Sequence, residues 1–347
     1  MNNLQDIKSL SIKELEEALS SIGEPKYRAK QIFLWLHKKY VQSFDEMLNL
    51  SKNLREKLKE NYYISDSAIE KKLISCYDST VKYLFSLNDG EYVEAVLMSY
   101  HHGYSACIST QAGCKMGCTF CATGQGGFRR SLTAGEMLSQ LQTMEKDRNV
   151  RISNVVLMGM GEPLDNYDNV IKFLHLVSDD DGMNIGMRHI AVSTCGLADK
   201  IRALADLKLQ ITLSVSLHAP NDEIRSATMP VNKRFPIDEL LSSCREYADK
   251  TGRRITFEYA MIAGVNDSIA CAAELCSRLK GMLCHVNLIP VNEVDKTGYK
   301  KSGKKSLNAF CDYLNSHGIP ATIRRTLGSD INASCGQLRG RVKDAES

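Results

Sequence analysis

Apolar residues at helical spacing characterise the first part of the chain. Ile12, Leu15 and Leu19 recur every three or four residues, which is the pattern of a helix with one buried face. The run Gly23-Glu-Pro25 then breaks this helix, and a second amphipathic segment follows it. The pattern therefore predicts a helical accessory domain at residues 1–65.

The next segment has the short alternating pattern of β-strands. Residues 80–87 and 91–98 are rich in Val, Tyr, Phe and Leu, and they flank the turn sequence Asn88-Asp-Gly90. Glycine at the end of such a turn favours a β-hairpin. We expect residues 66–100 to form a small β-sheet that links the helical domain to the rest of the chain.

Strand patterns and helix patterns alternate through residues 101–347. One predicted helix starts with the capping box Thr133-Ala-Gly-Glu136. Repeated β/α units build a parallel sheet with right-handed crossovers, so we predict an α/β fold containing a partial (β/α)6 barrel. The predicted strands are Cys107–Thr110, Ile152–Gly159, His189–Thr194, Ile211–Leu217, Ile255–Met261, His285–Ile289 and Ala321–Arg324.

Composition narrows the class of protein. The 347 residues begin with a polar run, and no apolar stretch is long enough to span a bilayer, so we expect a cytoplasmic protein. Twelve cysteines fit a reducing compartment, where disulfides are rare. The net charge is only +3, but basic residues cluster in three places that are candidates for phosphate contacts. One is the second predicted helix, whose residues Arg28, Lys30, Lys38 and Lys39 would make residues 1–65 an RNA-binding domain. The others are Lys296, Lys300, Lys301, Lys304 and Lys305, and Arg324, Arg325, Arg339 and Arg341.

Three of the cysteines carry the strongest chemical signal. Cys114, Cys118 and Cys121 form a CxxxCxxC triplet just after the first predicted barrel strand. Iron in a cubane cluster normally takes four protein ligands, so a triplet leaves one iron open. This spacing resembles the signature of radical S-adenosylmethionine (SAM) enzymes. A zinc site would need a fourth ligand nearby, and a disulfide framework is unexpected in so long a chain.

Polar residues follow several predicted barrel strands at their carboxyl ends. Catalytic groups of such barrels gather at this face, so these residues are candidates for a ligand pocket. Glu162 offers a carboxylate to an ammonium group, and the glycine before it allows close backbone approach. Taken singly, each would be an ordinary capped polar residue. The candidates are Gly161, Glu162, Ser193, Ser216, His218 and Asn292.

Two further cysteines, Cys107 and Cys335, would each be taken for a buried structural thiol in isolation. Their sequence context changes that interpretation. Cys107 precedes the triplet by seven residues, and Cys335 lies in the run Asp330-Ile-Asn-Ala-Ser-Cys-Gly-Gln-Leu338. Together with Gly159-Met-Gly-Glu-Pro-Leu164 and Ser216-Leu-His-Ala-Pro220, these runs make nearly the whole chain resemble the RlmN-type radical SAM methyltransferases.

The resemblance implies a function and a set of roles. Enzymes of this type methylate C2 of one adenosine in 23S rRNA and of one in the anticodon loop of some tRNAs, with a [4Fe–4S] cluster and two SAM molecules per turnover. It implies that Cys114, Cys118 and Cys121 hold the cluster. It also implies that the six strand-end candidates and Leu217 bind SAM. Cys335 would carry the methyl carbon, Cys107 would resolve the adduct as a disulfide, and Glu94 would accept the C2 proton.

The same resemblance implies partners and leaves alternatives open. It implies RNA as the macromolecular partner, a one-electron reductant such as flavodoxin, and a monomeric enzyme without a membrane. One alternative is the related enzyme that methylates C8 of the same ribosomal adenosine. Pro163 favours the C2 type, because C8-type relatives tend to have alanine there. Another alternative is a non-catalytic iron–sulfur protein that binds RNA.

Overall fold

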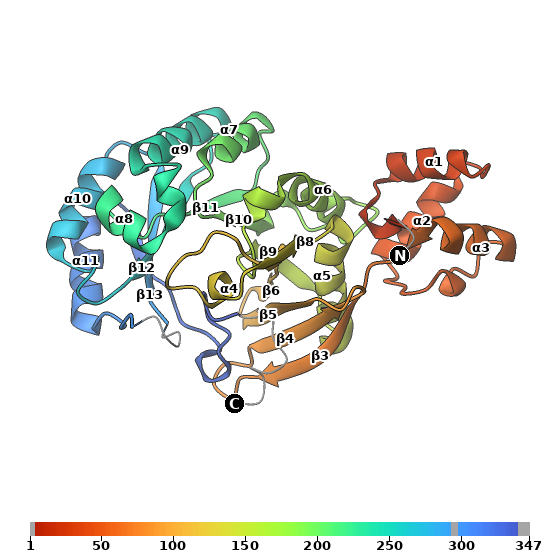
Figure 1. The fold of residues 1–347 in the computed structure, drawn as a ribbon, viewed down its shortest axis with the longest axis horizontal. Helices are drawn as coiled ribbons and strands as arrows, with labels where there is room; N and C mark the ends of the chain where they lie inside the picture. The colour runs from red at the N-terminus through yellow and green to blue at the C-terminus, as the bar shows by residue number, and fades with distance from the viewer. Residues whose placement is uncertain (1–3, 293–297, 339–347) are drawn as a thin grey trace.

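A computed structural model describes residues 4–292 and 298–338 of the chain (Figure 1). Its centre is a ten-stranded sheet in the order β14-β13-β12-β11-β10-β9-β6-β5-β4-β3. The first seven strands of this order are parallel and curve into the partial barrel. They are β6 Gly103–Cys107, β9 Ile152–Leu157, β10 Ile190–Thr194, β11 Thr212–Ser216, β12 Ile255–Met261, β13 Cys284–Pro290 and β14 Ala321–Ile323.

Helices pack on the outer face of the barrel, as the predicted β/α alternation requires. The predicted capping box at Thr133 and Glu136 is confirmed at the start of α5. α7 and α8 are the shortest of the barrel helices, with nine and seven residues. The barrel helices are α5 Ala134–Arg148, α6 Tyr167–Ser178, α7 Ala198–Asp206, α8 Asp222–Thr228, α9 Ile237–Thr251, α10 Ile269–Leu279 and α11 Lys304–Ser316.

Alternation along the strands separates a buried layer from the barrel interior. In β10, Ile190, Val192 and Thr194 are buried, whereas Ala191 and Ser193 between them are partly exposed. Successive strand side chains point to opposite faces, so the buried set packs under the helices and the other set lines the interior. This alternation turns Ser193 towards the barrel interior at the carboxyl end of its strand.

The predicted hairpin is confirmed, but its strands do not form a separate small sheet. β4 Val81–Leu87 pairs with β5 Tyr92–Tyr100 across the turn, and β3 Ser67–Ile74 covers the outer edge of β4. β5 then pairs antiparallel with β6 and joins the three strands to the barrel. The sequence pattern indicates the hairpin because its two strands are joined by a short turn. It does not indicate that β5 pairs with β6, because that pairing depends on tertiary contacts.

The first barrel strand ends earlier than expected. β6 ends at Cys107, and the following residues leave the sheet. A short antiparallel pair comes next, formed by β7 Gln111–Gly113 and β8 Phe128–Ser131, with the one-turn helix α4 Ala122–Gln125 between them. The cysteine triplet lies on the segment that this pair encloses.

Three helices form the N-terminal part, as predicted. They are α1 Ile12–Ser21, α2 Arg28–His37 and α3 Lys52–Asn61, and they lie at the end of the molecule beside α5 and α6 (Figure 1). Asp6 anchors this part, because its carboxylate accepts a hydrogen bond of 2.7 Å from the Thr133 hydroxyl at the start of α5. Within the described ranges, no helix combines the length and the apolar character that crossing a membrane requires.

Candidate active site

The three cysteines of the triplet lie on one tight loop after β7. Gly113, just before Cys114, has a φ of +76°, and a Cβ there would overlap the carbonyl oxygen of Gly127. Glycine is therefore required for the chain to turn into the loop. All three cysteines are half-buried and free of disulfides, and all three line one cavity.

Burial makes two of these thiols, Cys114 and Cys118, poor acids in the absence of a cation. Burial raises the pKa of Cys114 to about 12, and the nearby Glu162 and Cys121 add to the effect. Burial also raises the pKa of Cys118, with further increases from Cys121 and Cys114. The thiolate is the form of cysteine that binds iron. The positive charge of bound iron stabilises the thiolates, so these thiols would lose their protons when iron binds.

The arrangement of the donors fits a cluster better than one ion. In residues 4–292 and 298–338, no three His, Cys, Asp or Glu side chains are grouped to hold a single metal ion. Each cysteine of a cubane binds a different iron, so its ligands stand further apart than those of one ion. Cys114, Cys118 and Cys121 are therefore the residues that would hold a [4Fe–4S] cluster.

Most of the predicted SAM residues line the same cavity as the triplet. The cavity and its open mouth together contain about 1070 Å³ of empty space. The residues that it shares with the sequence prediction are Cys114, Cys118, Cys121, Gly161, Glu162, Ser193, Ser216, His218, Asn292 and Cys335. Leu217 does not line the cavity, because its side chain is buried in the core.

Glu162 is fixed by the backbone around it. Its two carboxylate oxygens accept hydrogen bonds from the backbone N–H groups of Leu164 at 3.0 Å and Cys195 at 2.7 Å. Gly161 before it has a φ of +101°, and a Cβ there would lie 2.6 Å from the Cβ of Gln111. Burial raises the pKa of Glu162, so a cation such as an ammonium group would stabilise the charged form.

His218 is a neutral hydrogen-bonding group at the cavity wall. Its Nδ1 accepts a hydrogen bond of 2.9 Å from the backbone N–H of Ala260, which places its proton on Nε2. Burial, and then the positive charge of Arg225, lowers the pKa of His218 to about 3. Its ring meets the edge of Phe120, in the cysteine loop, at a centroid distance of 5.0 Å.

The loop that carries Cys335 is joined to the cysteine loop and to the barrel. Asn292 Nδ2, after β13, donates a hydrogen bond of 3.1 Å to the backbone oxygen of Cys335. The next carbonyl, that of Gly336, accepts a hydrogen bond of 2.8 Å from the N–H of Ala122. Ala122 directly follows Cys121, so the tail cysteine lies beside the cluster loop.

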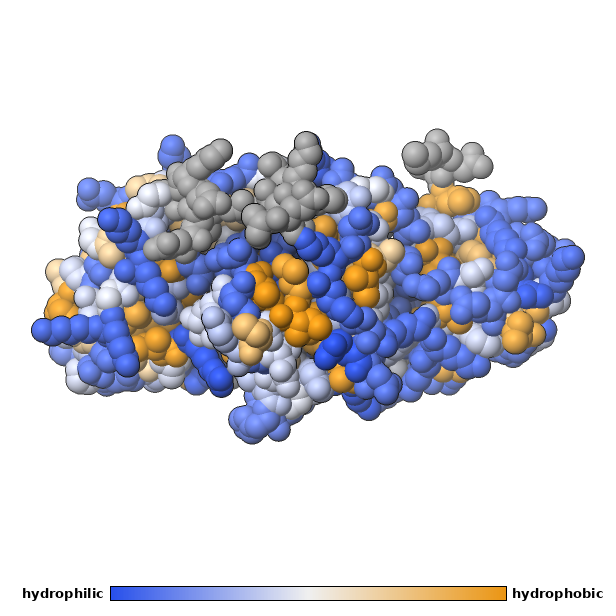
Figure 2. Space-filling view, turned by 90° about the horizontal axis from the view of Figure 1, so that it is seen from below, coloured by the Kyte–Doolittle hydropathy of each residue, from blue (hydrophilic) through white to orange (hydrophobic). Residues whose placement is uncertain are grey.

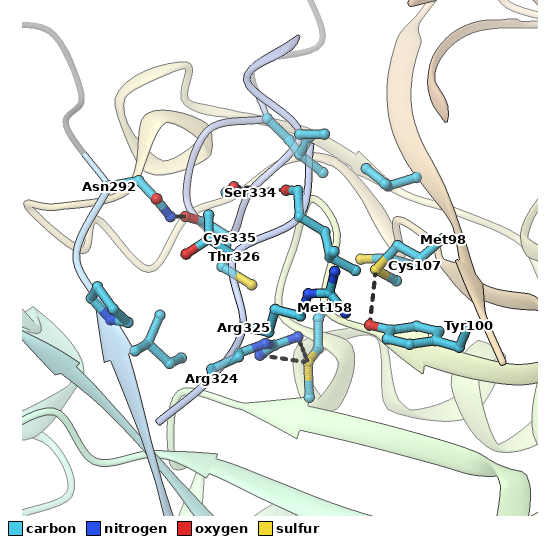
Figure 3. A pocket seen from close by; sticks show the side chains of 16 residues that line it. Met98, Tyr100, Cys107, Met158, Asn292, Arg324, Arg325, Thr326, Ser334 and Cys335 are labelled. Atoms are coloured by element: carbon cyan, nitrogen blue, oxygen red, sulfur yellow. Dashed lines mark hydrogen bonds between the residues drawn. The ribbon is translucent and has the colours of Figure 1, made fainter. Parts of the chain in front are cut away.

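Cys335 also faces a second cavity, which holds Cys107. This cavity encloses about 620 Å³ of empty space, and Figure 3 shows Cys107 and Cys335 on two sides of it, with Arg324 and Met158 between them. Burial raises the pKa of Cys107 to about 12, and the nearby Cys335 adds to this while Arg324 opposes it. Both cavities are lined by Met158, Ile289, Asn292, Arg324, Cys335 and Leu338, so Cys335 lies where they meet.

Comparison with known proteins assigns the chain to a family. Residues 3–64 match the ribosomal RNA large subunit methyltransferase N-terminal domain, and residues 108–276 match the radical SAM superfamily. A relative named probable dual-specificity RNA methyltransferase RlmN, from Alkaliphilus oremlandii, is 60% identical over 334 residues, which cover 96% of this chain and 97% of the relative. The chain belongs to the RlmN family of radical SAM methyltransferases.

Other members of the RlmN family and one solved structure agree with this assignment. A relative of the same name from Clostridium novyi is 54% identical and covers 97% of this chain and 98% of its own. The crystal structure of a radical SAM methyltransferase from Sphaerobacter thermophilus is 43% identical, has a TM-score of 0.92, and covers 97% of this chain and all of its own. The chain is therefore an enzyme with the radical SAM fold, and its cofactors are a [4Fe–4S] cluster and SAM.

Arg225 is an important residue of this RlmN site that sequence reasoning missed. Its guanidinium is completely buried and donates hydrogen bonds to the carbonyl oxygens of Cys195 at 2.6 Å, Ser216 at 3.2 Å and Leu217 at 3.1 Å. It thereby joins the carboxyl ends of β10 and β11, and it explains the inward position of Leu217. An arginine on the short helix α8 gives no sequence signal of burial.

Arg324 and Glu258 form a second buried pair that the sequence did not reveal. Arg324 Nη1 lies 3.6 Å from Glu258 Oε2, and both side chains line the SAM cavity. The nearby Cys335, and then Glu258, raises the pKa of Arg324, so the guanidinium stays charged. Sequence analysis placed Arg324 in a basic cluster suited to phosphates, whereas the structure turns it towards Cys335.

Glu94, the predicted proton acceptor, lies on β5 two residues before Val96, which lines the Cys107 cavity. It is buried on β5 and lines neither the SAM cavity nor the Cys107 cavity. Its carboxylate forms an ion pair of 2.9 Å with Lys82 on the neighbouring strand β4. The structure thus brings together the triplet, six of the seven SAM candidates, Cys335 and Cys107 around the two cavities, and it places Glu94 beside the lining of the Cys107 cavity.

Proposed function

We propose that this enzyme methylates C2 of one adenosine in 23S rRNA and of one in a tRNA anticodon loop, with Cys335 as the carbon carrier. One observation carries the proposal: Cys335 faces the cavity of the cluster and SAM on one side and the cavity of Cys107 on the other. A carrier needs access to the methyl donor first and to the resolving thiol later. The printed name of the relatives, a dual-specificity RNA methyltransferase, supports RNA as the substrate.

The electron-poor carbon C2 of adenine is a poor nucleophile, so it does not attack a methyl cation donor. When bound, the cluster and two SAM molecules supply a methyl group and a radical that removes hydrogen from it. Cys335 is the nucleophile for the methyl group: its thiolate forms the new C–S bond as the sulfonium C–S bond breaks. The carbon on Cys335 then forms a bond to C2, which links the RNA to the enzyme. The adduct gives up its unpaired electron, which the cluster would take back, and the C2 proton, which a base accepts.

Release of the RNA requires a second thiol. The Cys107 thiolate attacks the Cys335 sulfur, a disulfide forms, and the bond between that sulfur and the methylene carbon breaks. The electron pair stays with carbon, which takes a proton and becomes the methyl group of the product. The positive charge of Arg324, between the two cysteines in Figure 3, favours the thiolate at this junction.

The surroundings of the site suit an RNA ligand. The face seen in Figure 2 is mostly hydrophilic, with several apolar groups of which the most extensive lies near its middle. Part of the predicted basic surface is engaged within the protein, since Lys30 pairs with Asp181 at 2.8 Å. Lys300, Lys301, Lys304 and Lys305 remain candidates for phosphate contacts, whereas Lys296, Arg339 and Arg341 lie outside the described residues.

The experiment that tests this proposal is anaerobic reconstitution of the cluster, followed by reaction with SAM, a reductant such as flavodoxin, and an rRNA fragment. Mass spectrometry of the nucleosides should show 2-methyladenosine together with 5′-deoxyadenosine. Formation of 8-methyladenosine would instead support the C8 alternative, which Pro163 disfavours. Absence of 5′-deoxyadenosine would support the non-catalytic alternative, against the family assignment. Sedimentation of the same preparation tests the expected monomer.

A further inference from the structure

A buried ion pair reaches the loop of the carrier cysteine. Lys82 Nζ lies 2.9 Å from Glu94 Oε1, and the two side chains are only 11% and 9% exposed. The same ammonium group donates a hydrogen bond of 3.2 Å to the backbone oxygen of Asn332. Asn332 precedes Cys335 by three residues, so one lysine connects Glu94 with the carrier loop, which we define as residues 326–338.

Strand register places this pair beside the resolving thiol. Lys82 on β4 stands opposite Val96 on β5, and Val96 stands opposite Cys107 on β6. Residues in one such row, and those two positions away along a strand, point to the same face of the sheet. Glu94 is two positions from Val96, so the pair, Val96 and Cys107 share the face that the carrier loop covers.

The turn between β3 and β4 holds the first half of the carrier loop at further points. Asp78 Oδ2 accepts a hydrogen bond of 2.9 Å from the N–H of Gly328. Asp330 Oδ2 accepts one of 3.0 Å from the N–H of Cys76, in the turn between β3 and β4. Of these three contacts with the carrier loop, the one made by Lys82 is nearest in sequence to Cys335. The ion pair with Glu94 fixes the position of the Lys82 ammonium group.

We propose that Glu94 is a positioning residue, which acts through Lys82 to hold the carrier loop with Cys335 facing both cavities. A proton acceptor must come within hydrogen-bond reach of the proton that it removes. Glu94 lines neither cavity, and its carboxylate is engaged with Lys82. The contact with the loop does not depend on the proposed function. Only its expected effect on the methylation of Cys335 rests on that function.

The first test measures the loop without any chemistry. Hydrogen exchange of the carrier loop is compared in the wild type, Lys82→Met, Glu94→Gln and the double variant, which removes both buried charges. We expect roughly tenfold faster exchange at residues 328–335 in each variant, with no further increase in the double variant, because one shared contact is lost.

Two control variants accompany this measurement. Lys82→Arg should retain slow exchange. Lys72→Met is the matched control. Lys72 lies on the neighbouring strand β3, and its ammonium group pairs with Asp147 on α5 and not with the carrier loop. Unchanged exchange in Lys82→Met would overturn the proposal.

The second test links the loop to catalysis. Unmethylated, reconstituted protein receives SAM without RNA, and the mass of the Cys335 peptide is followed in time. We expect Lys82→Met and Glu94→Gln to slow methylation by the same factor, roughly tenfold, and Lys82→Arg to restore it. A Glu94→Gln enzyme that methylates Cys335 at the wild-type rate and accumulates the RNA adduct would overturn the proposal, because Glu94 would then be the proton acceptor. If wild-type Cys335 takes no methyl group, the proposed function fails, and the exchange result alone still decides the positioning role.

Discussion

Asn292 Nδ2 donates a hydrogen bond to the backbone oxygen of Cys335 at 3.1 Å. This bond joins the end of β13 to the loop after β14, and both residues line the two cavities. Asn292→Ala should therefore loosen Cys335 and lower its rate of methylation by SAM roughly tenfold. The rate is measured by mass spectrometry of the Cys335 peptide, with the exposed Asn308→Ala on α11 as control. Equal rates in the two variants would contradict this role.

The two thiols of the second cavity should respond differently to substitution. Cys107→Ala removes the group that attacks the Cys335 sulfur, so the covalent RNA adduct should accumulate. Cys335→Ala removes the carrier, so no adduct should form at all. Denaturing gel electrophoresis with labelled RNA checks both results. A Cys107→Ala enzyme that turns over freely would refute the resolving role.

The cysteine triplet should be needed for the cluster as well as for activity. Alanine at Cys114, Cys118 or Cys121 should remove the brown colour and the visible absorption of the reconstituted protein. Cys276→Ala on α10 is the control, because this half-buried thiol lines neither of the two cavities. Full iron content after loss of one triplet cysteine would contradict the assignment.

Arg225 should contribute to stability more than a surface arginine. Arg225→Met leaves three buried carbonyl oxygens without their donor, and we expect the free energy of unfolding to fall by about 3 kcal/mol. Arg202→Met on α7 is the control, because its ion pairs with Glu239 and Glu246 are partly exposed and such pairs contribute up to about 1 kcal/mol. Urea denaturation of both variants measures the difference. Similar losses would show that Arg225 does not tie the strand ends together.

His37 should make the protein sensitive to acid. Its ring is completely buried on α2, and burial lowers its pKa from 6.5 to about 3. The unfolded chain takes up this proton below pH 6.5, and the folded protein does so only near pH 3. Stability should therefore fall with falling pH in this window, by up to about 1.4 kcal/mol per pH unit from this group. His37→Leu should flatten that slope in urea titrations, whereas the exposed His175→Leu should not.

The sequence predicts the barrel and the cluster loop well for a physical reason. Buried parallel strands are continuous apolar runs, and the triplet lies on one short segment, so both are local signals. β5 pairs antiparallel with β6. The alternation of apolar and polar residues in each strand predicts a strand, but it does not indicate which other strand pairs with it. The hairpin was therefore predicted, and its place in the large sheet was not.

Buried charges are the part of the site that sequence reasoning could not reach. Arg225, Arg324 and Lys82 each look like ordinary surface residues in the sequence, because their partners come from distant segments. Glu94 shows the converse limit: the resemblance assigned it a role, and only the structure shows that its carboxylate pairs with Lys82. The charge environment of such a residue depends on which distant segments pack against it, and the local sequence does not show those segments.

The most direct test of the carrier role follows one methyl group. Cys335 is first methylated with SAM bearing a CD₃ group, free SAM is removed, and unlabelled SAM, reductant and RNA are then added for a single turnover. If Cys335 carries the carbon, one deuterium is removed, one solvent proton is added, and the product adenosine bears CD₂H. An unlabelled methyl group on the RNA, with CD₃ still on Cys335, would contradict the account.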